Sequence, residues 1–126
     1  SESTSPWLFD QCASAGSELL CEFVESAKKS QSLPEGTPQD DALVTHCGKV
    51  KKSDGEIDWT LSAIDVYRQI RTNLGWPGAF SFLPNGDGLK VHAAKLCSDE
   101  NVSGNAGEVV IGESLKLYVC CEHGAI

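Results

Sequence analysis

The sequence lacks the features of membrane-spanning proteins, of signal peptides and of proteins that bind nucleic acid over their whole surface. Its 126 residues contain no run of 18 apolar residues, so we do not expect the chain to span a membrane. Residues 1–6 are polar and lack the basic-then-apolar order of a signal peptide. Positive charge is also scarce, because ten Lys and Arg face 18 Asp and Glu, for a net charge of −8. This balance argues against a protein whose whole surface grips nucleic acid.

The cysteines lack the spacing of a zinc site. There are six, none in a C-x-x-C pair, and Cys120 and Cys121 are adjacent, which suits neither one tetrahedral site nor one disulfide. Cys12 and Cys21 fall in helical patterns, where cysteine acts as a small apolar residue. We interpret all six as reduced thiols of an intracellular protein and assign no metal ligands. A metal site using His46 or His123 with a neighbouring cysteine is the disfavoured alternative.

The residues that are present suffice for a folded domain. Hydrophobic residues make up 40% of the chain and charged residues 22%, which indicates one domain, or a small domain with an attached piece. The charge is unevenly spread. Residues 1–48 carry eight acids and two lysines, residues 49–95 carry seven basic residues and five acids, and residues 96–126 carry five acids and one lysine. The middle of this acidic chain is therefore its least acidic part, although chance could produce such a bias on a solvated surface.

The N-terminal third predicts helix followed by linker. Ser5 before Pro6 is typical of a helix start, and Gly16 is expected to end this first helix. A second helix is expected from Ser17, with a stripe of apolar residues and two lysines at its end. Residues 31–48 are rich in Ser, Pro, Gly and Asp, which indicates an extended linker.

The remainder predicts one helix among short strands. The helix is expected to be capped by Thr60 or Ser62, and its apolar stripe comprises Leu61, Ile64, Tyr67, Ile70 and Leu74. Strands are expected at 79–83, 89–96, 109–111 and 115–121, with turns at 84–88, 112–114 and 122–124. Short strands at this spacing indicate a small barrel. Trp59, Trp76 and Phe80 lie at element boundaries, so we expect them in the core rather than as platforms for bases.

The middle of the chain carries a more specific pattern. It runs Lys49-Val50-x-Lys52-x-x-Gly55-x-Ile57-Asp58-Trp59-x-x-Ser62-Ala63, then Ile70-Arg71, then Trp76-Pro77-Gly78-Ala79-Phe80. This pattern resembles the start of the C-terminal domain of methionyl-tRNA formyltransferases, and weaker similarity extends to both ends. The resemblance implies an α+β chain: residues 1–30 as the last helices of the N-terminal formyltransferase domain, 31–48 as the linker, and 49–126 as an OB-like barrel with one helix, which we expect to be truncated.

The resemblance also implies a function. The family transfers a formyl group from 10-formyltetrahydrofolate to the amine of initiator methionyl-tRNA, in the cytoplasm, using Asn, His and Asp of an N-terminal catalytic domain. The His-Pro-Ser-x-Leu-Pro motif of that domain is absent from these residues. The chain also offers no carboxylate pair, nucleophile–base pair or metal cluster. We therefore expect a non-catalytic fragment with no cofactor of its own, whose partners are the initiator tRNA and the catalytic domain of the same protein.

The candidate tRNA-binding residues are Lys49, Lys51, Lys52 and Arg71. Clustered lysines suit phosphate contacts that carry no sequence information, but they could also be the solvated end of a linker. Arg71, like Arg68, could instead pack its stem or bind backbone carbonyls.

Another function also remains open. Where the family has Asn-Pro before Trp-Pro, this chain has Leu74-Gly75, and it has Ser53 where the family has Glu. These departures and the overall acidity allow the matching lobe, without tRNA, of a relative that formylates a sugar nucleotide or hydrolyses formyltetrahydrofolate.

Overall fold

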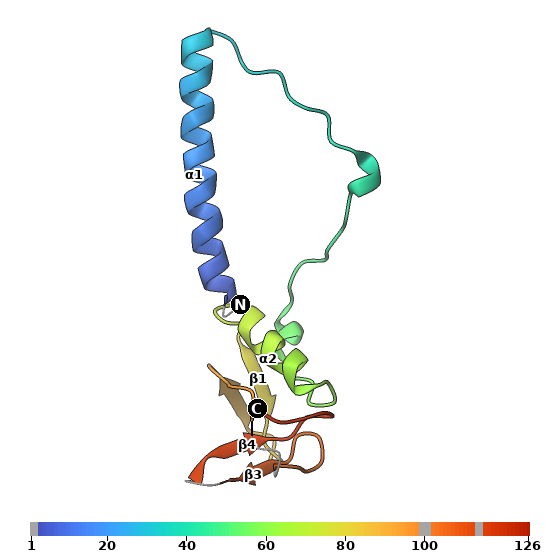
Figure 1. Cartoon of the computed structure of the whole chain (residues 1–126). Coiled ribbons are helices and arrows are strands. Elements are labelled where there is room, and N and C mark those ends of the chain that lie inside the picture. Colours follow the sequence, from blue (N-terminus) through green and yellow to red (C-terminus); the bar gives the residue numbers. More distant parts are fainter. Residues whose placement is uncertain (1–2, 99–101, 113–114) are drawn as a thin grey trace. The chain divides into compact units, whose positions relative to one another are not determined.

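The computed structural model describes residues 3–98, 102–112 and 115–126. The chain forms two compact units: residues 6–49, and residues 50–126 together with the first five residues. We describe each unit by itself, with the elements as labelled in Figure 1.

The helical unit contains one long helix, α1 (Ser5–Ser30). The prediction of two helices separated at Gly16 is wrong. A glycine inside a helix costs only about 1 kcal/mol relative to alanine, which good helix formers around it offset. The Ser17 hydroxyl, expected to cap a second helix, instead donates to the carbonyl of Ser14 at 2.7 Å, within the continuous helix. No described residue of α1 is buried, and its apolar side chains are exposed.

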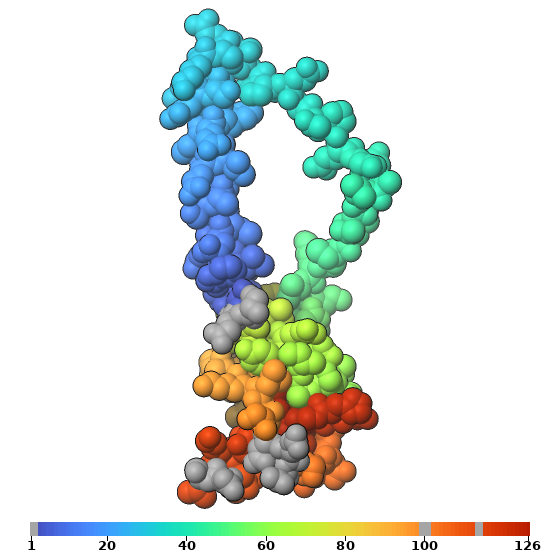
Figure 2. Space-filling view, viewed as in Figure 1, coloured from blue at the N-terminus to red at the C-terminus, as the bar shows by residue number. Residues whose placement is uncertain are grey.

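The linker of this unit is extended apart from one short turn. The 3₁₀ helix η1 (Asp41–Leu43) is started by Asp40, whose carboxylate accepts a hydrogen bond from the Ala42 amide at 2.9 Å. Figure 2 draws the linker, coloured cyan to green, as a single thin run of atoms. Within the described residues, no helix is both long and apolar enough to cross a membrane.

The second unit begins with a 3₁₀ helix, η2 (Lys52–Gly55), and continues into α2 (Ala63–Thr72). Ser62 is the N-cap of α2: its hydroxyl accepts from the Asp65 amide at 3.3 Å and donates to the Asp65 carboxylate at 2.7 Å. This confirms one of the two predicted caps and the pairing with Asp65.

The predicted buried face of α2 is partly wrong. The residues that α2 buries are Ala63, Val66 and Ile70, whereas Leu61 and Ile64 are each 40% exposed. Both stripes have helical spacing and share Ile70. The buried stripe has the smaller side chains, Ala63 and Val66 beside Ile70, which suits close packing of α2 on the segments beneath it.

Two antiparallel hairpins follow α2. Strand β1 (Ala79–Phe82) pairs with β2 (Gly88–Val91), and β3 (Val109–Ile111) pairs with β4 (Leu117–Val119). The predicted turn at 84–88 joins the first pair, and the predicted turn at 112–114 lies partly outside the described residues. β2 and β4 are shorter than predicted. After the turn at 122–124, Ile126 exchanges two backbone hydrogen bonds with Val119.

The architecture of this unit is therefore helix with small antiparallel sheet. In the described part of the chain the strands form two separate two-stranded sheets, and single bridges join Glu56 to Phe80 and Ser62 to His123. An α+β arrangement is present, and the OB-like barrel stays a prediction.

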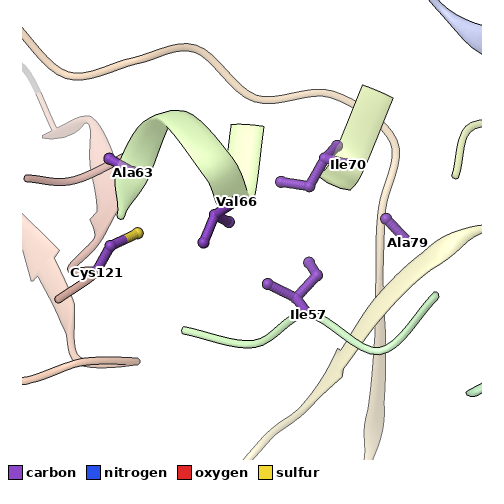
Figure 3. Packing of buried hydrophobic residues seen from close by; sticks show 6 residues of the cluster. All are labelled: Ile57, Ala63, Val66, Ile70, Ala79 and Cys121. Atoms are coloured by element: carbon purple, nitrogen blue, oxygen red, sulfur yellow. The ribbon is translucent and has the colours of Figure 1, made fainter. Parts of the chain in front are cut away.

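The core of the unit lies between α2, the segment before it, β1 and the C-terminal segment. Figure 3 shows six buried residues that face one another: Ile57, Ala63, Val66, Ile70, Ala79 and Cys121. Trp59 packs against this cluster, as predicted, and its indole donates to the Ser81 hydroxyl at 2.9 Å. Phe80 is half-buried and lies outside the cluster.

Trp76 does not belong to the core, and its assignment there was wrong. It is 66% exposed. It lies in the connection from α2 to β1, where the neighbouring Pro77 and Gly78 take the inward place against Gly55. A boundary position therefore did not suffice to bury a tryptophan.

Candidate nucleic-acid interface

The lysine run crosses from the linker into the second unit. Lys49 is the last residue of the helical unit, and Lys51 and Lys52 belong to the second unit. All three side chains are exposed. Mobile ammonium groups in water can meet phosphate oxygens without first giving up buried contacts, so the exposure suits phosphate binding. Asp54 and Glu56 follow closely, so the net charge of residues 49–56 is only +1.

The backbone beneath Lys51 and Lys52 is held in place by hydrogen bonds. The Asp54 carboxylate accepts from the Lys51 amide at 2.8 Å, which closes the 3₁₀ turn. The buried Asn73 donates through Nδ2 to the Asp54 carbonyl at 3.0 Å. Gln69 donates to the Glu56 carbonyl at 2.7 Å. Two side chains of the α2 region therefore fix the turn that carries these lysines.

Sequence reasoning missed Asn73 and Gln69. The backbone carbonyl of Asn73 also accepts a hydrogen bond from the Gly78 amide at 2.9 Å, so this one residue joins η2, the end of α2 and the turn before β1. The sequence does offer a signal, since an asparagine next to a glycine-containing turn is typical of a helix C-terminus. It does not reveal which distant carbonyl the side chain will reach.

Arg71 differs from the lysines. Its side chain is half-buried, and the guanidinium carbon lies 5.1 Å from the centre of the Tyr67 ring. One guanidinium nitrogen donates to the backbone carbonyl of Ser3, while Nε is buried with no hydrogen-bond partner among the described residues. This is the packing role weighed above as the alternative. A phosphate contact by Arg71 stays a prediction. The guanidinium would have to bind the phosphate while it also contacts Tyr67 and the Ser3 carbonyl.

Arg68 forms a local ion pair on the surface. Its guanidinium lies 3.0 Å from the Asp65 carboxylate, one turn away on α2. Hydrogen bonding from Ser62, followed by that from Arg68, lowers the pKa of Asp65 below its ordinary value of 3.8. The side-chain and backbone hydrogen bonds of Thr60 similarly lower the pKa of Asp58. Both carboxylates are thus held ionised beside the start of α2.

Two of the cysteines, Cys120 and Cys121, are buried. Burial raises the pKa of both thiols, which makes them poor nucleophiles at neutral pH. Among the described residues, no three His, Cys, Asp or Glu side chains are grouped so that they could hold a metal ion.

Comparison with known proteins places this arrangement in a family. Residues 49–126 match the family model described as the formyl transferase C-terminal domain. That match covers more than half of the chain. The chain belongs to this family.

Curated relatives extend the similarity to most of the chain. The chain is 34% identical to a methionyl-tRNA formyltransferase of Acinetobacter baumannii over 122 residues, which is 96% of the chain and 38% of that protein. It is 35% identical to one from Citrifermentans bemidjiense over 119 residues, 94% of the chain and 36% of the relative. It is 34% identical to one from Stutzerimonas stutzeri over 125 residues, 99% of the chain and 38% of the relative.

The formyl transferase C-terminal domain therefore accounts for the second unit. The chain spans less than two-fifths of the length of these relatives. The resemblance identified from Lys49 to Phe80 is confirmed by the family match, and it includes the lysine run and the turn that positions two of its members.

Proposed function

We propose that this chain is the tRNA-docking part of a methionyl-tRNA formyltransferase. In this proposal the parent enzyme moves a formyl group from 10-formyltetrahydrofolate to the amine of initiator methionyl-tRNA. The chemistry belongs to a catalytic domain outside these residues. The formyl transferase C-terminal domain, as an OB-like module, helps to bind and orient the tRNA. The parent activity is supported by the relatives reported above, which are methionyl-tRNA formyltransferases.

The observation that carries the docking role is the exposed lysine run on a fixed turn. Lys51 and Lys52 are exposed, while Asn73 and Gln69 hold the backbone beneath and beside them. A fixed backbone with mobile ammonium groups suits contact with a phosphate backbone of defined shape. Such contacts position a nucleic acid without reading its sequence.

Docking by a separate domain would raise the rate as well as the affinity. Formyl transfer needs the amine and the formyl donor held in attack geometry, and binding energy from remote parts of a substrate can be used for this orientation. The sugar-nucleotide and hydrolase alternatives need no tRNA contact at all, so tRNA binding separates them from this proposal.

The test is a titration of the 126-residue chain with initiator tRNA at low and moderate salt. The unchanged chain should bind, and a variant with Lys49, Lys51 and Lys52 changed to Ala should bind at least tenfold more weakly at low salt. Lys116→Ala is the matched control, because this exposed lysine lies at the other hairpin. Absence of binding, or equal binding by the triple variant, would contradict the docking role.

A further inference from the structure

A groove lies beside the lysine run, entirely within the second unit. Its volume is about 640 Å³, within the range of small-molecule sites. It is lined by η2, the turn before β1, and both strands of the first hairpin. Lys52 lines it and also belongs to the lysine run, so the two features are continuous.

The hairpin presents an aromatic pair and a cation to this groove. In the register of β1 and β2, Phe80 lies opposite Lys90 and Phe82 lies opposite Gly88. Residues directly opposite each other share a face of an antiparallel pair, and residues two apart along a strand also share it. Phe80, Phe82 and Lys90 therefore lie on one face, while Ala79 and Val91, on the other, join the core.

One ring of the pair is available to a ligand. The Phe80 and Phe82 rings meet edge to face, with centroids 5.7 Å apart and planes at 84°. Phe82 is 56% exposed. Gly88 opposite it has no side chain, and a Cβ there would meet no atom within 4 Å. The space beside Phe82 is thus open.

We propose that this groove holds an unpaired nucleotide of the docked RNA. The base would stack on Phe82, and the flanking phosphates would lie against Lys52 and Lys90. Aromatic faces with nearby cations are the usual means of holding single-stranded nucleic acid, and unpaired bases are the parts of RNA that stack on aromatic side chains. This inference rests on the proposed tRNA docking, to which it adds a second RNA contact in the groove beside the lysine run.

Charge within the groove also shapes the binding. Lys52, Lys90 and His92 line it together with one acid, Glu56. The negative charge of the Glu56 carboxylate would repel a bound phosphate, so Glu56→Gln is expected to tighten RNA binding by a few fold. Its backbone carbonyl, which accepts from Gln69, is unaffected by that change.

The experiment measures anisotropy of a labelled single-stranded RNA hexamer with the 126-residue chain at low salt. Gly88→Val places a branched side chain in the groove at a position where an added Cβ would meet no atom within 4 Å, and it is expected to weaken binding about tenfold. Phe82→Leu removes the ring and should do the same, whereas Phe82→Trp keeps a stacking face and should bind at least as well as the unchanged chain. Circular dichroism establishes that each variant is folded.

Three outcomes would overturn the groove assignment. These are equal hexamer binding by Gly88→Val, equal binding by folded Phe82→Leu, and tighter binding of adenosine diphosphate than of the hexamer. The first two would leave the docking role intact if the lysine variant still loses initiator tRNA. Failure of the unchanged chain to bind initiator tRNA would instead remove the docking role and this inference together.

Discussion

Gly55 lies so close to Gly78 that no side chain fits between them. A Cβ at Gly55 would lie 2.1 Å from the Gly78 carbonyl oxygen and 3.1 Å from Cγ of Pro77. The buried end of η2 is thereby pressed against the turn that leads into β1. This contact sets the place of Lys51 and Lys52 on the surface.

The first prediction follows from that contact. Gly55→Ala should lower the free energy of unfolding by about 2 kcal/mol or more, because a backbone oxygen cannot move aside as a flexible side chain would. Urea unfolding followed by circular dichroism measures the change. Gly36→Ala, in the open linker with nothing within 4 Å of its Cβ position, is the matched control and should leave the unfolding midpoint unaltered. Equal midpoints for both variants would show that the contact is looser than described.

The second prediction concerns the hydrogen bond between Trp59 and Ser81. Trp59→Phe keeps most of the apolar ring but removes the indole donor, so unfolding should become easier by about 1 kcal/mol. A double-mutant cycle with Ser81→Ala should give a coupling of similar size. Trp76→Phe serves as the control, because Trp76 is 66% exposed and its change should have little effect. A larger loss for Trp76→Phe than for Trp59→Phe would contradict the placement of both residues.

These two tryptophans show what the sequence could and could not predict. The family pattern correctly predicted a formyl transferase C-terminal domain from residue 49 onward. Local chemistry limited the cap of α2 to Thr60 or Ser62, and it predicted the hairpin turn after Phe82 and the strand at 109–111. Burial of Trp76 could not be predicted, because it depends on which neighbour the turn directs inward. The prediction of the buried face of α2 was partly wrong for the same reason. Two stripes with helical spacing were available, and only tertiary packing selects which of them is buried.

The candidate binding residues divide in the same way. The lysine run is visible in the sequence as a local cluster. The contact of Arg71 with Tyr67 is local, because the two residues lie one turn apart on α2, whereas its hydrogen bond to the Ser3 carbonyl depends on the fold. The groove was missed because Lys52 and Lys90, which both line it, lie on η2 and β2, and only the fold places these two elements around one groove.

The third prediction is a loss of stability in acid. The pKa of Asp65 is lower in the folded chain than its ordinary value of 3.8, so below that value the unfolded chain binds the proton first. Its contribution is complete above about pH 3.8 and is lost as the pH falls through the folded pKa. Asp65→Asn should therefore destabilise the chain at pH 7 and by a smaller amount at pH 3, measured by urea unfolding. An equal or larger loss at pH 3 would contradict the assignment, and Asp10→Asn in α1 controls for net charge.

The fourth prediction concerns thiol reactivity. Cys12, Cys21 and Cys47 are exposed, whereas Cys120 and Cys121 are buried with raised pKa values. Brief treatment with iodoacetamide at pH 7.5, followed by peptide mass spectrometry, should label the first three well before the last two. Denatured chain provides the reference in which all six react. Labelling of Cys120 as fast as Cys12 in the native chain would contradict the described core.

The central claim, that the lysine run docks RNA through phosphates, is tested most directly by the salt dependence of tRNA binding. The logarithm of the binding constant should fall linearly with the logarithm of the salt concentration, and three phosphate contacts account for about 2 to 3 units of that slope. Changing Lys49, Lys51 and Lys52 to Ala should remove this share, while Lys116→Ala should leave the slope unchanged. Equal slopes for the unchanged chain and the triple variant would contradict the account.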